Sequence, residues 1–120
     1  MMIYLSVGIG GMLGSLARFV LGRMISEKSN VSFPLGTFVI NLSGAILLGV
    51  VTSLGMGDTL YALFGEGFLG AYTTFSTFMY EGFNLFAGNE KINALVYILG
   101  SMVISIIGYA MGMMITGIFI

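Results

Sequence analysis

The stretch Thr73-Thr74-Phe75-Ser76-Thr77-Phe78 places four hydroxyl groups and two aromatic rings near the middle of an otherwise apolar segment. Polar side chains inside a membrane cost free energy unless hydrogen-bond partners satisfy them. Phe75 and Phe78 are three residues apart, so their rings lie on one face of a helix. The stretch therefore indicates either a polar path through a membrane or a tight interface between helices.

The overall composition is that of an integral membrane protein. The 120 residues are 58% hydrophobic and 8% charged, with a mean hydropathy of +1.06, whereas an ordinary soluble domain has about 25% charged residues. The absence of cysteine and histidine removes thiolate chemistry and the commonest general bases, so we do not expect an enzyme. A net charge of −1 with four basic residues provides no surface for nucleic acid.

Four segments are long and apolar enough to cross a membrane, because about 20 helical residues span a hydrocarbon core of about 30 Å. They cover residues 3–22, 34–53, 59–86 and 92–120. The polar stretch 23–32 is expected to end the first helix, and Pro34 favours the start of the second. We therefore predict an all-α integral membrane protein with a single four-helix transmembrane domain, residues 1–120.

The third segment is too long for one straight helix, because its length of about 28 residues would reach about 42 Å. Gly65, Gly67 and Gly70 precede the hydroxyl cluster, and glycine tolerates the backbone angles of an interruption. We predict a break between Gly70 and Thr74, whose freed carbonyls need a cation or hydroxyl groups as partners. The alternative is an intact tilted helix whose Ser and Thr side chains bond carbonyls one turn earlier.

Four runs of residues carry a resemblance to a known family. They are Gly10–Phe19 (GGMLGSLARF) in the first segment, Pro34–Thr37 (PLGT) with Asn41 and Gly44 in the second, Gly70–Phe78 (GAYTTFSTF) in the third, and Tyr97 with Ser101 in the fourth. In order and spacing these runs resemble the Fluc/CrcB fluoride channels, and the resemblance covers essentially the whole chain. The family usually has a second glycine where Ala71 stands.

The resemblance implies an antiparallel, dual-topology dimer in the cell membrane, with two fluoride pores at the subunit interface. The pore positions correspond here to Asn41, Phe75, Phe78, Tyr97 and Ser101, and Ser76 and Thr77 are expected to complete a polar track beside the rings. The vestibule arginine of the family corresponds to Arg18. A structural sodium ion, which is held by main-chain carbonyls and is not transported, corresponds to Gly70 and Thr73.

Physical chemistry supports these residue types but leaves structural alternatives open. The edge of an aromatic ring is positive, so Phe75 and Phe78 can coordinate an anion without a fixed charge that would hold it tightly. They can equally pack against neighbouring helices. Asn41 has amide donors that can replace water around fluoride, or that can bridge two helices. Two glycine pairs, Gly10 with Gly14 and Gly108 with Gly112, indicate helix-packing surfaces.

Charged residues within the spans need water or partners. Arg18 is expected less than about one and a half turns from the first loop, so it can snorkel there, and the resemblance implies a position near an aqueous vestibule. Glu81 follows Phe78 by one turn and is expected either to pair with a hydroxyl or to cap a helix interaction. No role in proton transfer is assigned to it.

The basic residues of the loops bear on orientation and partners. Arg23, Lys28 and Lys91 are expected on one side of the membrane, which by the positive-inside rule is the cytoplasmic side. A homodimer built from both orientations is expected to show little bias of this kind. Two assemblies therefore stay open, a homodimer and a heterodimer with an oppositely oriented paralogue.

Passive, fluoride-specific export across the cell membrane, which reduces cytoplasmic fluoride and its toxicity, is the function that the resemblance implies. One alternative is a small multidrug-type, proton-coupled exporter, which also forms four-helix dimers but depends on an acidic residue in its first helix. Residues 3–22 contain no Asp or Glu. The other alternative is a membrane assembly subunit that transports nothing.

Overall fold

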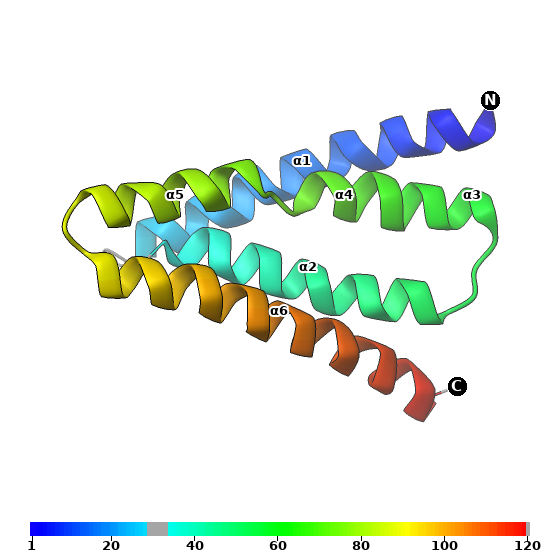
Figure 1. The fold of residues 1–120 in the computed structure, drawn as a ribbon. Coiled ribbons are helices and arrows are strands. Elements are labelled where there is room, and N and C mark those ends of the chain that lie inside the picture. Colours follow the sequence, from blue (N-terminus) through cyan, green and yellow to red (C-terminus); the bar gives the residue numbers. More distant parts are fainter. Residues whose placement is uncertain (29–33, 120) are drawn as a thin grey trace.

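Four passes of helix along one axis make up the fold (Figure 1). The computed structural model describes residues 1–28 and 34–119. Its elements are α1 (Met2–Lys28), α2 (Leu35–Ser53), α3 (Asp58–Tyr61), the π-helix η1 (Ala62–Leu69), α4 (Gly70–Tyr72), α5 (Ser76–Ala87) and α6 (Lys91–Phe119). Both chain ends and the α2–α3 turn lie at one end of the bundle, and the α5–α6 turn lies at the other. This arrangement agrees with the prediction of four crossings.

Three of the four passes are continuous helices. Within the described ranges, α1, α2 and α6 are the helices that are long and apolar enough to cross a membrane. The remaining pass is assembled from α3, η1, α4 and α5, which follow one another in line beside α2 (Figure 1). The 12 residues of α5 are too few to span a bilayer alone, so the two halves cross it together. The chain is therefore a multi-pass membrane protein.

The predicted break in the third pass is confirmed. The helix ends at Tyr72, Thr73 is extended with φ −81° and ψ 158°, and α5 begins at Ser76. The reason that we gave for its position was wrong, because Gly70 is itself helical with φ −61° and ψ −37°. Gly65 and Gly67 lie instead in the wide turn of η1, which the sequence pattern did not predict.

The first helix is longer than its apolar stretch. It continues through the polar residues to Lys28, and the Arg23 Nε donates a hydrogen bond of 3.0 Å to Glu27 Oε1 one turn on. Such pairs between residues four apart stabilise an exposed helix end. Our expectation that Arg18 lies close to the first loop was therefore wrong, because ten further residues, almost three turns, separate it from the end of the helix.

Glycine allows the helices to pack backbone to backbone, as the two glycine pairs predicted. A Cβ at Gly10 or Gly14 would overlap carbonyl oxygens of η1, and a Cβ at Gly112 would overlap the carbonyl oxygen of Ile46 in α2. A Cβ at Gly108 would press on the side chains of Leu42 and Ile46. Close approach adds dispersion contacts that the hydrophobic effect does not supply between helices in lipid. These contacts therefore hold α1 against η1 and α2 against α6.

Substituting alanine at Gly112 should separate α2 from α6 and reduce stability by about 1–3 kcal/mol, because the added methyl group meets backbone that cannot yield easily. Gly117→Ala is the matched control, since a Cβ at this position of the same helix meets nothing within 4 Å. Unfolding of both variants in a titration with denaturing detergent would measure the difference. Equal midpoints for the two variants would contradict the packing role.

Candidate functional site

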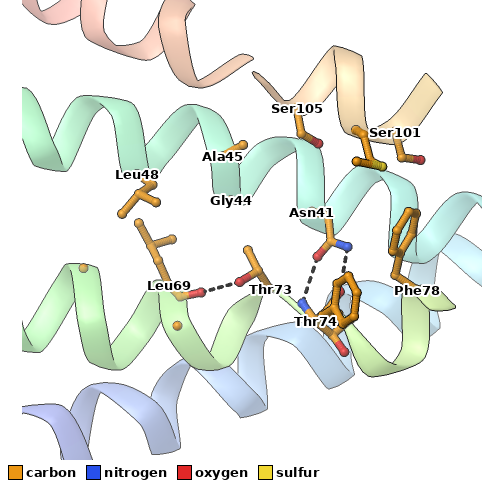
Figure 2. Close-up of a pocket in the computed structure, with 14 residues that line it drawn as sticks. Asn41, Gly44, Ala45, Leu48, Leu69, Thr73, Thr74, Phe78, Ser101 and Ser105 are labelled. Carbon is orange, nitrogen blue, oxygen red and sulfur yellow. Dashed lines mark hydrogen bonds between the residues drawn. The ribbon is translucent and has the colours of Figure 1, made fainter. Parts of the chain in front are cut away.

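The side chain of Asn41 in α2 forms hydrogen bonds with the backbone at the break in the third pass. Its Nδ2 donates a hydrogen bond of 2.8 Å to the carbonyl oxygen of Thr74, and the amide of Thr74 donates one of 2.9 Å to Asn41 Oδ1 (Figure 2). Both backbone groups of one residue are thereby satisfied by one side chain. Since unsatisfied backbone groups are costly in a membrane, this pairing makes the break tolerable there. One N–H of the Asn41 amide is left over, because the group has two.

The pairing redirects donors away from two carbonyl groups. In a continuous helix the Thr74 amide would bond the Gly70 carbonyl, but here it bonds Asn41. The Thr77 amide would bond the Thr73 carbonyl, but it donates to Thr74 Oγ1 at 3.3 Å. The Gly70 and Thr73 carbonyls thus lose the donors that a helix supplies. They are the two groups to which the resemblance assigns sodium, and oxygen ligands of this kind suit a hard cation.

The break adjoins a cavity of about 410 Å³ between α2, the third pass and α6. Its polar and aromatic lining consists of Asn41, Thr73, Thr74, Phe75, Phe78, Ser101 and Ser105. In Figure 2 the labelled polar groups of α2 and α6 gather at one end of the cavity, and Leu48 and Leu69 lie toward the other. Among the described residues that form its wall, none is charged. The cavity therefore offers dipoles without a fixed charge.

Ser101 is the clearest free donor in this wall. The residue is buried to 5% exposure, and its hydroxyl oxygen has no hydrogen-bond partner within the described residues. A buried hydroxyl without a partner carries a desolvation cost of about 1–3 kcal/mol. A group that binds in the cavity can recover that cost by accepting the hydrogen bond.

The two phenylalanine rings of the cavity differ in burial. Phe78 is 6% exposed and Phe75 is 74% exposed, with 6.2 Å between their ring centroids and an angle of 51° between their planes. Phe78 in turn packs on Tyr97 of α6, with 5.1 Å between centroids. The inner ring is therefore held by the core, whereas the outer ring projects from the subunit.

A second pocket, of about 370 Å³, lies between α1, α2 and α5 on the other side of the break. Its wall includes Arg18, Arg23, Thr37, Thr77 and Glu81. Thr74 lines this pocket and the cavity as well, so the two spaces adjoin at the break. Arg18 thus lies in the wall of a pocket between three helices, almost three turns before the end of α1.

Thr37 and Glu81 are joined by a hydrogen bond from the threonine hydroxyl to Glu81 Oε1. This bond confirms the expectation that Glu81 pairs with a hydroxyl group. It connects α2 to α5 one turn before Asn41 connects α2 to Thr74. Thr37 lies four residues before Asn41, so the two residues share a face of α2, and this spacing is the sequence signal that would have pointed to Thr37.

The structure does not bring every predicted pore residue to the cavity. Tyr97 is fully buried, at 0% exposure, in a cluster with Phe78, Leu85 and Ala94, and it supports the Phe78 ring from behind. Ser76 is exposed and lines neither pocket, and Thr77 lines the second pocket, between α1, α2 and α5. Ala71 lies within the helical turn α4, where a Cβ is tolerated, so the departure from the usual glycine needs no left-handed backbone.

Comparison with known proteins gives a family for this architecture. The model of the family described as "CrcB-like protein, Camphor Resistance (CrcB)" matches residues 5–113. This chain belongs to the CrcB family. A relative from Clostridium acetobutylicum, named "Fluoride-specific ion channel FluC 2", is 55% identical over 109 residues, which cover 91% of this chain and 93% of the relative.

Two more distant relatives of this CrcB chain carry related names. The "Fluoride-specific ion channel FluC 2" of Moorella thermoacetica is 48% identical over 104 residues, covering 83% of this chain and 84% of the relative. The "Fluoride-specific ion channel FluC" of Aquifex aeolicus is 39% identical over 116 residues, covering 89% and 94%. The similarity therefore extends over nearly the full length of each protein.

Replacing Thr37 with valine keeps the side-chain shape and removes the donor to Glu81. We expect a loss of about 1–3 kcal/mol in stability, because a partly buried carboxylate loses a hydrogen bond. Thr52→Val is the control, since Thr52 is exposed on the same helix. Thermal unfolding of both purified variants measures the effect, and a Thr37→Val protein as stable as the control would show that the bond contributes nothing.

Proposed function

We propose that this chain is the subunit of a fluoride-specific ion channel, which exports fluoride passively across the cell membrane and is not an enzyme. Family membership and the names of the relatives support this function. The observation that carries it is the cavity at the break, which is lined by an amide, a free buried hydroxyl and two phenylalanine rings and by no charged side chain among the described residues. Uncharged donors can replace the hydration of a small anion without trapping it.

The two pockets suggest a path for the ion. Arg18 raises the local concentration of anions in the pocket between α1, α2 and α5, whereas Arg23 in the same wall is paired with Glu27. From there fluoride passes Thr77 and Thr74 to the cavity, where Asn41 and Ser101 offer N–H and O–H donors. The edges of Phe75 and Phe78 continue the path, because their hydrogens carry partial positive charge. Tyr97 contributes by fixing the Phe78 ring.

A second subunit in the opposite orientation is proposed to complete the path. Phe75 lines the cavity while most of its ring is exposed, so one wall of the path is missing in a single chain. Gly70 is also exposed beside the break. An antiparallel partner that covers this face would close two equivalent paths at one interface and would bury the broken backbone away from lipid.

The carbonyls of Gly70 and Thr73 are proposed to hold a structural sodium ion. Their fit rests on the redirected amides of Thr74 and Thr77, which leave these carbonyl oxygens in need of a positive partner. Carbonyl oxygens suit a hard cation such as sodium, so carboxylate ligands are not required. The ion would neutralise the dipoles of the broken helix and would not be transported.

Either a homodimer or a heterodimer fits the charge distribution. Arg23, Lys28 and Lys91 lie at the same end of the bundle, as the sequence predicted. This bias favours one orientation for each chain and hence a partner with the opposite bias. The relatives' names include both "FluC 1" and "FluC 2", which is consistent with paralogous pairs. We favour the homodimer over the heterodimer because a bias of three charges is small.

Fluoride efflux from proteoliposomes tests the function. Vesicles loaded with potassium fluoride and reconstituted with the purified chain should release fluoride to an external electrode within seconds, whereas vesicles loaded with chloride should retain it. Folded protein that gives no flux alone, but does so with an oppositely oriented relative, would reject the homodimer. Absence of flux in both cases would reject the channel and favour an assembly subunit. Proton-coupled export of organic cations would favour the multidrug alternative.

Replacing Phe75 or Phe78 with isoleucine should reduce fluoride flux by about tenfold or more while the protein stays folded. Isoleucine keeps apolar bulk but has no positive edge, and a lost contact of about 1.5 kcal/mol changes a rate by this factor. Phe83→Ile on the same helix is the control, since Phe83 lines neither pocket. Unchanged efflux in both cavity variants would assign the rings to packing.

A further inference from the structure

The pairing of Asn41 with Thr74 has a consequence for the cation as well as for the anion. Asn41 lines the cavity together with Gly70 and Thr73, so one wall carries both the proposed anion donor and the proposed cation ligands. The two hydrogen bonds of Asn41 involve the backbone of the residue that directly follows Thr73. The backbone of the break is therefore held by a side chain that lines the cavity.

The amide of Thr74 has two possible acceptors. The Gly70 carbonyl lies four residues earlier and is the acceptor that helical geometry offers. The Asn41 Oδ1 is the acceptor that the tertiary structure provides, at 2.9 Å. If Asn41 Oδ1 were removed, the amide would lack a partner in an apolar setting, and closing back on Gly70 would be the nearest way to satisfy it. That closure would occupy the carbonyl that a cation needs.

Other hydrogen bonds keep the rest of the break in place. Leu69 O accepts both the amide of Thr73, at 3.0 Å, and its hydroxyl, at 2.9 Å. These bonds fix the end of the helix but leave the Thr73 carbonyl beyond it. Ser43 and Tyr72 share a hydrogen bond of 2.9 Å that also joins α2 to α4 without touching the backbone of the break. Of these contacts, the one from Asn41 decides which acceptor the Thr74 amide uses.

We propose that Asn41 is a positioning residue for the structural cation: by taking the Thr74 amide, it keeps the Gly70 carbonyl open to sodium. This inference rests on the proposed sodium site. Its remaining N–H faces the anion, so a single side chain serves both ions. The acceptor oxygen of the amide supports the cation site, and the donor nitrogen supports permeation. The two roles can therefore be separated by chemistry at one position.

The test compares Asn41→Asp with Asn41→Leu. Asp keeps an oxygen that can accept the Thr74 amide, whereas Leu keeps only the bulk. Sodium affinity is measured without fluoride, from the sodium concentration that half-maximally raises the unfolding temperature of the purified dimer, with a large organic cation as replacement. We expect Asn41→Leu to bind sodium about tenfold more weakly, the effect of losing one net hydrogen bond. Asn41→Asp keeps the acceptor and adds a charge that attracts a cation, so it should bind sodium at least as tightly as the wild type.

Ser43→Ala is the matched control, because it removes a different hydrogen bond between α2 and α4 and should leave sodium affinity unchanged. Fluoride efflux should collapse in Asn41→Asp, since a negative charge then faces the anion, although sodium is still bound. Equal sodium affinity in Asn41→Leu and the wild type would overturn the positioning role and leave the sodium site standing. If sodium does not change the unfolding temperature of the wild-type protein, the positioning role and the sodium site are both overturned. Fluoride flux of that protein would still test the channel function. If Asn41→Leu does not fold, loss of sodium binding in Asn41→Asp would overturn the proposal.

Discussion

The structure depends on how a broken helix is satisfied inside a membrane. A break in the third pass frees backbone amides and carbonyls in surroundings without water, where each unsatisfied group costs several kcal/mol. The Asn41 side chain removes this cost for Thr74, because its amide nitrogen donates to the Thr74 carbonyl and its amide oxygen accepts from the Thr74 N–H. The Thr74 hydroxyl then serves the amide of Thr77. The two carbonyls left over are those that suit a cation.

The same break creates the chemistry of the cavity. A continuous helix would turn all its polar backbone inward and present only side chains to its neighbours. By ending at Tyr72 and restarting at Ser76, the third pass brings the Thr74 backbone against α2 and lets one residue line two adjoining pockets. An arginine-lined pocket thus meets an uncharged cavity at the point where the helix is interrupted. In the proposed path, the anion is attracted in the first of these spaces and coordinated in the second.

Backbone packing of the outer helices supports this arrangement. Gly14 lies against η1, so α1 packs closely on the third pass, and Gly112 lies against α2, so α6 packs closely on α2. Helix association in lipid lacks a hydrophobic driving force and relies on such close packing. Tyr97 adds an internal support, because its buried ring fixes Phe78 at the edge of the cavity. Rigid surroundings of this kind keep weak, uncharged donors in place.

The sequence by itself determined the membrane environment, the four passes, the break and the residue types of the site, because hydropathy and local spacing act along the chain. The resemblance of its motifs to the Fluc/CrcB family predicted that Asn41, Phe75, Phe78 and Ser101 belong together, and the structure gathers them around one cavity. Only the tertiary structure decided that Tyr97 stands behind the ring, that Thr37 holds Glu81, and that the break falls at Thr73 instead of a glycine. These outcomes depend on contacts between residues more than 15 positions apart, and such contacts leave no periodic signal in a single sequence.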